Sequence, residues 1–490
     1  MKILLVYPRH LDTFWSFKHV LSFLGKRSAF PPLGLLTVAA MLPREWSLKI
    51  VDANVEPLED ADLDWADWVF LSGMIVHQDS AREIALRAAA RGRPVIAGGP
   101  LFTTGHAGFP EIPHFVLGEA EGVIGDLVAD MRAGTVKARY RAAGFPDLGD
   151  SPAPRWDLID PRRYVTMPVQ FSRGCPFDCE FCDIVAMYGR RPRTKAPAQV
   201  IAELEALRRA GWRDKVFIVD DNFIGHKRRV RELLAALIGW RARTRAEMGF
   251  LTEASINLAD DAALMEDMVR AGFRKVFIGL ETPVAESLQE CAKVQNSRRD
   301  LVEAVRAIQS AGLEVMGGFI VGFDSDPPDV FRRQFEFIQR AGVVTAMVGL
   351  LSALPQTRLY ARLAREGRIL ADSIGDNTAA VLNFVPRLER ARLLEGYREL
   401  MRSLYGPCNY YRRVRAFLAT WQPRGPRLRL GWPDVRAFLQ SLWLLGVRER
   451  GRLGYWRLLV GTLLVRPPKL RAAMELAIMG HHFRAVAERL

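Results

Sequence analysis

Residues 171–184 read "FSRGCPFDCEFCDI" and hold three of the five cysteines in the chain. Cys175, Cys179 and Cys182 follow a CxxxCxxC spacing, and no fourth cysteine lies nearby. Thiols grouped on so short a segment form disulfides, bind a metal ion or hold a cluster. Each of these uses makes a different demand on the rest of the chain.

A disulfide framework does not suit this set. Three is an odd number, and the opening "MKILLVYP" lacks the charged start, apolar core and cleavage site of a secretory signal. We therefore expect a large intracellular chain, in which clustered cysteines favour metal or redox chemistry. A structural zinc site would need four protein ligands, but no further CxxC and no HxxxH motif follows the cysteines.

An iron–sulfur cluster explains three cysteines best. A four-iron cluster normally takes four thiolates, one for each iron. Three thiolates leave one iron without a protein ligand, and an open metal position is where a substrate or cofactor binds. Cys175, Cys179 and Cys182 are therefore the predicted cluster ligands. The alternative is a set of ordinary thiols, which is how we interpret Cys291 and Cys408.

Length and composition agree with a large enzyme. A chain of 490 residues, 49% of them hydrophobic, should form two or three domains with substantial cores. The chain is basic, with 69 Lys and Arg against 55 Asp and Glu, and residues 411–490 alone hold 16 against four. No uncharged apolar run reaches the ~18 residues of a membrane span.

The first 140 residues alternate between short apolar runs and helical patterns. The runs lie at 2–8, 48–55, 68–74, 94–100 and 114–120, with helical patterns at 31–42 and 80–92. Nearly continuous apolar strands predict a parallel sheet covered by helices, whose ligands bind at the carboxyl ends of the strands. Glycines in "SGM" (72–74), "GGP" (98–100) and "GEAE" (118–121) would let a large ligand approach the backbone, although turn glycines without a ligand are the alternative. No GxGxxG follows the first strand, so a dinucleotide is not indicated.

A second alternation follows a segment rich in Pro, Asp and Gly at residues 142–156. Its apolar runs lie at 166–174, 215–223, 249–258, 275–283, 314–324 and 344–355. Six strand–helix units fit a partial (β/α)6 barrel, in which chemistry gathers at the carboxyl ends of the strands. At those ends stand Asp220, Asp221, Asn222, Glu253, Ser255, Glu281, Thr282, Gly318 and Gly322. Some of these, Asp220 to Asn222 above all, could instead cap the next helix.

The cysteine spacing, with Phe181 before the last cysteine and the motif after the first barrel strand, resembles the radical S-adenosylmethionine superfamily. The resemblance implies an α/β fold with a partial TIM barrel, a 4Fe–4S cluster, and S-adenosylmethionine chelating the fourth iron. "DDNF" (220–223) stands where the family usually has a glycine-rich motif with Glu, "EAS" (253–255) resembles its ribose-binding strand, and "GFIVG" (318–322) resembles the strand beside adenine. The S-adenosylmethionine-binding residues so implied are Phe181, Asp220, Asp221, Asn222, Glu253, Ser255, Glu281, Gly318 and Gly322.

Residues 1–140 resemble the Rossmann-like cobalamin-binding domain fused to many of these enzymes, with "SGM", "AGGP" and "LGEAE" as its ligand loops. The residues placed against cobalamin are Ser72, Gly73, Met74, Gly98, Gly99, Pro100, Gly118 and Glu119. Mutase-type domains carry DxHxxG after the first strand; "PRHLDT" (8–13) keeps His10 in register but lacks the Asp and the Gly. His10 is thus a candidate cobalt ligand, and His77 is a second. The loss of the motif favours cobalamin without a protein histidine.

The whole layout is similar to the subfamily that contains the hopanoid C-2 methylase. The similarity rests on "FPPLGLLTVAAMLP" (30–43), "NFIG" (222–225), "LSALPQTRLY" (351–360) and "GYRELMRSLYGPCNYYRRV" (396–414). It implies a cobalamin-binding domain (1–141), a linker (142–164), a radical barrel (165–365) and a mainly helical, basic C-terminal region (366–490). The tRNA methylthiotransferases are disfavoured, because their N-terminal domain binds a second cluster through cysteines and residues 1–174 hold none.

The resemblance implies a methylase that moves a methyl group through methylcobalamin to an unactivated carbon of a hopanoid or another isoprenoid lipid. S-adenosylmethionine cleaved at the cluster would give the radical that removes hydrogen from this carbon, so no acid–base dyad is expected. The electron would come from an external donor of the flavodoxin or ferredoxin type. Two alternatives stay open: oxidation, cyclisation or ring rearrangement without methyl transfer, and a non-catalytic cobalamin or redox sensor.

The basic C-terminal region bears on the substrate. Residues 435–480 interleave Trp, Leu and Phe with Arg, as in an amphipathic helix that lies in the headgroup layer of an anionic membrane. This predicts a cytoplasmic enzyme with peripheral contact to the inner face of the membrane through residues 411–490. The alternatives are a helical cap on the barrel and nucleic-acid binding; no nucleic acid is expected, because the sequence shows no recognition module. Tyr188 and the arginines of residues 188–195 either contact a cofactor or form a solvated loop.

Overall fold

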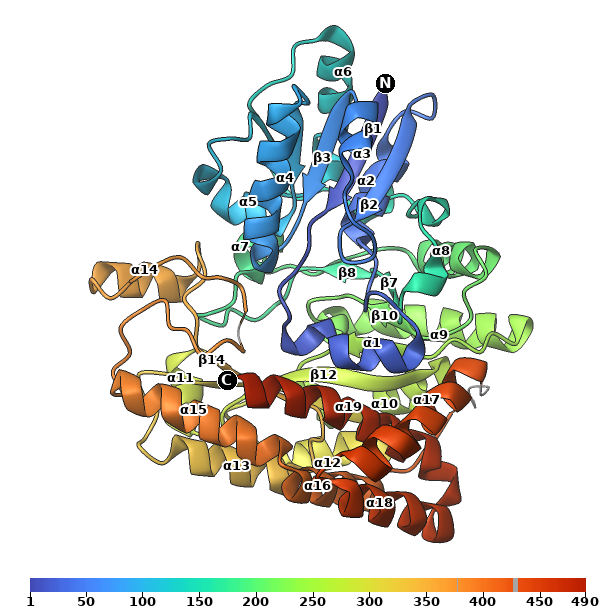
Figure 1. The fold of residues 1–490 in the computed structure, drawn as a ribbon, viewed down its shortest axis with the longest axis vertical. Coiled ribbons are helices and arrows are strands. Elements are labelled where there is room, and N and C mark those ends of the chain that lie inside the picture. The colour runs from blue at the N-terminus through green and yellow to red at the C-terminus, as the bar shows by residue number, and fades with distance from the viewer. Residues whose placement is uncertain (377, 426–430) are drawn as a thin grey trace.

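The computed structural model describes residues 1–376, 378–425 and 431–490. Three regions follow one another along the long axis of the molecule: an N-terminal α/β domain, a central parallel sheet with its helices, and a layer of C-terminal helices (Figure 1). In the described part of the chain, no helix combines the length and the apolar character needed to cross a membrane. The arrangement confirms the predicted fold class.

The N-terminal domain is built on a six-stranded parallel sheet in the order β2-β1-β3-β4-β5-β6. The strands are β1 (Lys2–Tyr7), β2 (Ser47–Asp52), β3 (Trp68–Ser72), β4 (Val95–Gly98), β5 (His114–Leu117) and β6 (Arg139–Arg141). The helices are α1 (Lys18–Leu24), α2 (Leu33–Met41), α3 (Asp60–Trp65), α4 (Gln78–Ala90), α5 (Pro100–Gly105) and α6 (Ile124–Ala133). All five predicted strands are present. Strand β6 escapes sequence prediction, because one apolar residue, Tyr140, gives no periodic signal.

The central sheet has six parallel strands in the order β14-β13-β12-β11-β10-β7. The strands are β7 (Met167–Val169), β10 (Val216–Ile218), β11 (Phe250–Glu253), β12 (Phe273–Glu281), β13 (Glu314–Val321) and β14 (Ala346–Leu350). Between them run α8 (Pro197–Arg209), α9 (Lys227–Thr244), α10 (Ala262–Ala271), α11 (Ala285–Glu290), α12 (Leu301–Ala311) and α13 (Val330–Ala341). Because β7 and β14 stand at opposite edges of the sheet, the barrel is partial, as predicted.

Side chains alternate along these strands, so each strand contributes to two layers. Val216, Ile218, Val276 and Ile278 face the surrounding helices and are fully buried. The residues between them face the inside of the partial barrel, where they line a cavity. The outer layer holds the sheet and helices together, while the inner layer is available for ligands.

The C-terminal region consists of α14 (Arg358–Arg365), α15 (Arg390–Tyr405), α16 (Pro407–Thr420), α17 (Trp432–Trp443), α18 (Arg452–Val465) and α19 (Leu470–Arg489). Helix α19 packs against α1, which comes from the other end of the chain. The rings of Phe14 and Phe483 stack with their centroids 4.2 Å apart, and His482 Nε2 lies 2.9 Å from the carbonyl oxygen of Phe14. These two segments together wall the open side of the partial barrel, where both line its cavity.

Residues 142–164 connect the two α/β regions by a packed segment. Trp156 is buried, and the hydroxyl of Tyr164 donates a 3.0 Å hydrogen bond to Asp52 at the end of β2. The Pro and Gly residues of this segment therefore lie in turns that are held in place. The turns pack against the N-terminal domain and extend it.

Candidate active site

The cysteine loop leaves β7 and is pinned by a small antiparallel ladder of β8 (Ser172–Arg173) and β9 (Arg193–Thr194). Gly174 follows with φ +94°, a backbone conformation that side chains rarely adopt. A Cβ at this position would lie 2.9 Å from the carbonyl oxygen of Gly189, so the close approach of the two strands of the loop requires glycine. Helix α7 (Ile184–Tyr188) then closes the loop.

Two acidic residues at the end of β10 hold this loop in place. Asp220 accepts hydrogen bonds from the Phe171 N–H at 2.8 Å and the Ser172 hydroxyl at 2.7 Å, and Asp221 accepts one from the Gly174 N–H at 2.8 Å. Burial raises the pKa of Asp220 to about 7 and that of Asp221 to about 6. Their observed contacts position the loop backbone; their contact with S-adenosylmethionine stays a prediction.

All three predicted cluster cysteines lie near the ammonium group of Lys293. Burial raises the pKa of each thiol, and the charge of Lys293 opposes that rise. The amide nitrogen of Asn222 lies 3.8 Å from Cys175 Sγ, and that of Gln295 lies 3.9 Å from Cys179 Sγ. A positive charge and amide donors beside sulfur favour the thiolate, which is the form that binds iron.

The three thiols are the ligand type that an iron–sulfur cluster takes. Among the described residues, no group of three or more His, Cys, Asp or Glu side chains is placed to hold one metal ion. A four-iron cluster takes each thiolate on a different iron. Cys179 is buried, whereas Cys175 and Cys182 are half-buried. These three thiols fit the predicted 4Fe–4S cluster.

The other polar residues predicted to bind S-adenosylmethionine lie at the same edge of the sheet. The Ser255 N–H donates a 3.2 Å hydrogen bond to Asn222 Oδ1, while Glu281, with φ +61°, accepts a 2.6 Å hydrogen bond from Lys293. Glu253 is half-buried at the cavity wall. Burial, helped by two neighbouring aspartates, raises the pKa of Glu253 to about 8.

Phe181, Gly318 and Gly322 complete this predicted set. The Phe181 ring packs against Phe323, with centroids 6.3 Å apart. A Cβ on Gly318 would lie 2.7 Å from the ring of Phe277, and Gly322 adopts φ +107°, so both positions require glycine for packing or turn geometry. Contact of these three residues with the cofactor stays a prediction.

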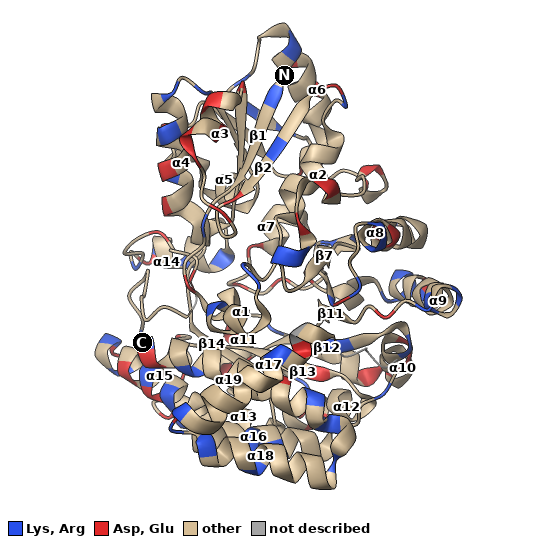
Figure 2. Cartoon of the chain, turned by 45° about the vertical axis from the view of Figure 1, so that its right-hand side comes forward, with Lys and Arg blue, Asp and Glu red and all other residues tan. Residues whose placement is uncertain are grey.

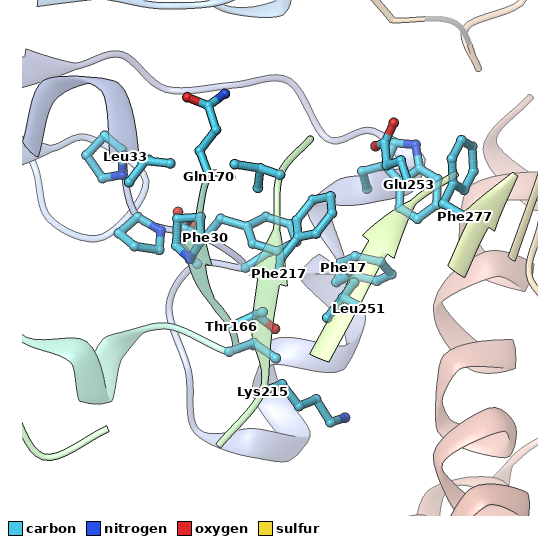
Figure 3. A pocket seen from close by; sticks show the side chains of 18 of the residues that line it. Phe17, Phe30, Leu33, Thr166, Gln170, Lys215, Phe217, Leu251, Glu253 and Phe277 are labelled. Carbon is cyan, nitrogen blue, oxygen red and sulfur yellow. Dashed lines mark hydrogen bonds between the residues drawn. The ribbon is translucent and has the colours of Figure 1, made fainter. Parts of the chain in front are cut away.

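A cavity of about 1670 Å³ lies between the N-terminal domain, the barrel and the C-terminal helices. Its barrel half is lined by the apolar residues Trp15, Phe17, Phe30, Phe217, Leu251, Phe277, Met316 and Met347. Figure 3 shows Phe30, Phe217 and Leu251 between Lys215 at one end of the strands and Glu253 at the other. The cavity therefore joins the edge that carries the cysteine loop to the far end of the barrel.

The same cavity reaches all of the predicted cobalamin loops. Its lining includes Ser72, Gly73, Met74, Gly98, Gly99, Pro100, Gly118 and Glu119. Gly99 has φ +88°, and a Cβ there would lie 2.5 Å from Ser72 Oγ, whereas a Cβ on Gly118 would meet no atom within 4 Å. The cavity continues along α2, beside Phe70 and Ile96, where apolar side chains would hold the aromatic base that cobalamin carries. The site thus fits cobalamin.

The two histidines near these loops differ in their contacts. His10 lines the cavity, and its Nδ1 lies 2.8 Å from the carbonyl oxygen of Leu11. His77 is buried, and its Nδ1 accepts a 3.0 Å hydrogen bond from the Met74 N–H. Burial lowers the pKa of His77 to about 4, so this ring is neutral at pH 7. Ligation of cobalt by His10 stays a prediction.

An ion-pair brace joins a cobalamin loop to the cysteine loop. The guanidinium of Arg173 lies 2.5 Å from Glu119 and 2.7 Å from Glu121, and that of Arg193 lies 2.6 Å from Glu119. Both carboxylates are almost fully buried. Glu119, predicted to contact cobalamin, is therefore engaged by two arginines, and Arg193 of the predicted basic loop points to the N-terminal domain instead of solvent.

Comparisons with known proteins agree with this geometry. Residues 169–338 match the radical SAM superfamily, residues 27–128 match the B12 binding domain, and residues 357–490 match a domain of unknown function, DUF4070. The chain is 40% identical to the uncharacterized methyltransferase sll1242 of Synechocystis, over 99% of this chain and 91% of that protein. It is 32% identical to the hopanoid C-2 methylase of Rhodopseudomonas palustris, over 94% and 89% of the two chains. The chain belongs to the cobalamin-dependent radical S-adenosylmethionine methyltransferases.

The fold of this methyltransferase is shared with a solved member of the wider group. The cobalamin-dependent S-adenosylmethionine radical enzyme OxsB, with aqua-cobalamin bound, superposes with a TM-score of 0.65 over 100% of this chain and 79% of that chain, at 14% identity. The predicted cofactors of the methyltransferase are confirmed: a 4Fe–4S cluster, S-adenosylmethionine and cobalamin.

Sequence reasoning missed three parts of the methyltransferase's site. Lys293 and Gln295 stand beside the thiols although they lie more than a hundred residues beyond the cysteine motif. The brace around Glu119 joins residues of separate domains. None of these contacts leaves a fixed spacing in the sequence, because each arises only when distant loops meet.

Proposed function

We propose that this methyltransferase methylates an unactivated carbon of an isoprenoid lipid of the hopanoid type. The observation that carries the proposal is the cavity, whose barrel half is lined by aromatic and aliphatic side chains. Its volume of about 1670 Å³ exceeds the ~300–1,000 Å³ of ordinary ligand sites, as a site that takes more than one ligand requires. The 32% identity to the hopanoid C-2 methylase supports the same substrate class.

When bound, the cluster, S-adenosylmethionine and cobalamin would supply the radical and the methyl group. The side chains of the protein give the site its shape and exclude water from it. Phe217, Leu251 and Phe277 offer no hydrogen-bonding side chain, so they orient an apolar substrate by shape and keep water away from it. Glu253 stands at the cofactor end of this wall. Because burial raises its pKa to about 8, this carboxyl keeps its proton at pH 7 and can donate a hydrogen bond there.

A lipid substrate has to be collected from a membrane, and two C-terminal helices offer a surface for this. Exposed apolar side chains recur every three or four residues on α17, at Trp432, Val435, Leu439 and Trp443, and on α18, at Leu453, Trp456, Val460 and Leu464. Side chains of this size scattered singly on a surface are ordinary, but stripes of them mark an interaction site. We propose that α17 and α18 lie in the headgroup layer of a bilayer.

The charges beside these stripes suit an anionic membrane. The exposed charged residues of this segment are Arg436, Arg448, Arg450, Arg452 and Arg457. Its acidic residues are paired, Asp434 with Arg471 and Glu449 with Arg484. Basic residues mark the C-terminal helices α16 and α18 in Figure 2. Helix α19, by contrast, packs into the molecule, so the predicted helical cap and the proposed membrane surface belong to different helices.

The enzymatic proposal is tested by anaerobic assay of the reconstituted protein. The protein receives cobalamin, a reductant, S-adenosylmethionine with a labelled methyl group, and a hopanoid-containing lipid extract. We expect label in a lipid, together with deoxyadenosine and S-adenosylhomocysteine. Deoxyadenosine without labelled lipid or S-adenosylhomocysteine would instead favour oxidation, cyclisation or ring rearrangement.

The membrane proposal is tested by co-sedimentation with phosphatidylglycerol vesicles. We expect binding that weakens as salt rises, because part of the attraction is electrostatic. The variant Trp443→Glu/Leu464→Glu should lose at least tenfold in affinity. The control is Leu86→Glu, which alters another exposed leucine, on α4 and far from the proposed surface. Equal binding by both variants would contradict the proposal.

A further inference from the structure

The end of the cavity remote from the cysteine loop is polar. Lys215 precedes β10, Lys275 lies on β12, Glu314 begins β13 and Glu475 comes from α19, and all four line the cavity. Lys215 Nζ and Lys275 Nζ lie 2.8 and 3.0 Å from Glu475 Oε1. Lys275 Nζ also lies 3.0 Å from Glu314 Oε2. We call these four residues the polar floor.

One acceptor of the polar floor is left without a partner. Glu314 is only 5% exposed, yet its Oε1 has no hydrogen-bond partner. A buried acceptor left unsatisfied costs about 1–3 kcal/mol, so such atoms are rare in native proteins and call for an explanation. The side chains of Lys215 and Glu475 keep 29% and 31% of their surface accessible, and both line the cavity. A ligand in the cavity can therefore meet donors and acceptors here.

The balance of charge narrows the chemistry of that ligand. Burial would raise the pKa of Glu475, but Lys215 and Lys275 outweigh it and lower that pKa, so Glu475 is ionised. Burial raises the pKa of Glu314 in spite of Lys275. Within the polar floor, two lysines and two carboxyl groups thus place hydrogen-bond donors and acceptors side by side. A hydroxyl suits the polar floor, because it can both donate to a carboxylate and accept from a lysine.

We propose that the polar floor recognises a hydroxyl group at the end of the substrate remote from the reacting carbon. This inference rests on the proposed function, since it assumes that the lipid occupies the barrel half of the cavity. Lys215 precedes Val216, which pairs with Phe250, and Glu253 follows three residues after Phe250. At ~3.3 Å per residue, the two ends of the wall stand ~13 Å apart. The substrate is thus an amphiphile with a long apolar body between its hydroxyl and the carbon that is methylated.

The alternating faces of the strands fit this picture. The inward positions are Lys215, just before β10, then Phe217 on β10, and Glu314 then Met316 on β13. Each strand therefore offers a polar contact at its start and an apolar contact two residues later. Such a sequence of contacts fixes the direction in which an amphiphile lies along the strands.

The test is direct binding of two tritiated probes to the cobalamin-loaded enzyme in detergent: a polycyclic triterpene alcohol and the hydrocarbon with the same skeleton. We expect the wild type to bind the alcohol at least tenfold more tightly than the hydrocarbon. Without the hydroxyl, the polar groups of the site are left without a hydrogen-bond partner. Glu314→Gln and Lys215→Met should each reduce this preference severalfold. The matched control is Met316→Leu, which alters the apolar wall two residues from Glu314 and should leave the preference intact.

The outcomes separate the two proposals. If the wild type binds neither probe, the proposed substrate class is wrong. If it binds both equally, or if both variants keep the full preference, the lipid proposal stands and the polar floor is a structural ion-pair network. Should Glu314→Gln fail to fold by circular dichroism, Glu475→Gln replaces it, since Glu475 lies on α19 and is more accessible.

Discussion

At the scale of single residues, the cysteine loop depends on side chains that come from several other loops. The spacing of Cys175, Cys179 and Cys182 predicted a cluster, and the predicted superfamily is confirmed. The acidic residues after β10 were predicted to bind the cofactor, but their visible contacts hold the cysteine loop. Only the structure shows that the charge of Lys293 acts on the thiols, because Lys293 lies on a loop far from them in the sequence.

Replacing any one of the three cysteines should abolish the cluster. We expect Cys175→Ala, Cys179→Ala and Cys182→Ala to bind less than a tenth of the wild-type iron and to form at least 100-fold less deoxyadenosine. Iron analysis and the absorbance of the reconstituted cluster check the first result. Cys408→Ala, at an exposed thiol on α16, is the matched control and should behave as the wild type does.

Glu253 should make the stability of the cofactor-free protein depend on pH. Burial raises its pKa from 4.5 to about 8 in the folded protein, so the folded state keeps a proton that the unfolded chain has already lost. Its contribution to stability is therefore complete below pH 4.5 and is lost as the pH rises towards 8. Between pH 5 and 8, the free energy of unfolding in urea should fall less in Glu253→Gln than in the wild type. The difference should be on the order of 2 kcal/mol.

The control for this experiment is Glu399→Gln, which alters an exposed glutamate on α15. Its unfolding free energy should follow that of the wild type at every pH. A wild-type slope retained in Glu253→Gln would assign the pH dependence to other groups.

At the scale of elements, strands were easier to predict than their surroundings. Every predicted strand exists, because runs of buried β-branched and aromatic residues are a strong local signal. Residues 435–480 were predicted to form one amphipathic surface, but the helices within them differ. Helices α17 and α18 expose apolar stripes, whereas α19 packs into the molecule. An Arg- and Leu-rich helix looks the same in sequence whether its apolar face meets a membrane or another helix.

The packing of α19 predicts the effect of two glycine substitutions. A Cβ on Gly480 would lie 2.2 Å from the ring of Tyr410, whose hydroxyl donates a 2.6 Å hydrogen bond to the carbonyl of Leu476 and so fixes the ring. Gly480→Ala should therefore destabilise the protein by about 1–3 kcal/mol and lower its melting temperature.

Gly461 in α18 is the matched control, because a Cβ there meets no atom within 4 Å. Gly461→Ala should be neutral or stabilise the helix by up to ~1 kcal/mol. Thermal unfolding followed by circular dichroism compares the two variants. A similar loss in both would mean that α19 does not pack on Tyr410 as described.

At the scale of the whole molecule, the site exists only between regions. The predicted cobalamin loops belong to one domain, the cysteine loop to the next, and part of the cavity wall to the C-terminal helices. The resemblance to known families predicted the fold of each region separately. The relative placement of the regions depends on contacts such as the Glu119 brace, which no local sequence pattern predicts.

Loss of that brace should loosen the N-terminal domain. Glu119→Gln removes the carboxylate that pairs with Arg173 and Arg193, while their positive charges stay buried. We therefore expect the free energy of unfolding to fall by about 3 kcal/mol. Limited proteolysis should also cut residues 142–164 faster. The exposed pair Arg132–Glu45 offers the control, and Glu45→Gln should leave the unfolding free energy unchanged, because water screens this pair.

The contact between Phe14 and His482 has a consequence for how the chain is made. The two residues are 468 positions apart. At roughly 5–20 residues per second, a ribosome needs on the order of half a minute or more to produce the second after the first. Throughout that time Phe14 and α1 lack the helix that covers them, and the barrel stays open on one side. The nascent chain therefore carries Phe14 and α1 uncovered until α19 has been made, and co-translational chaperones should be found there.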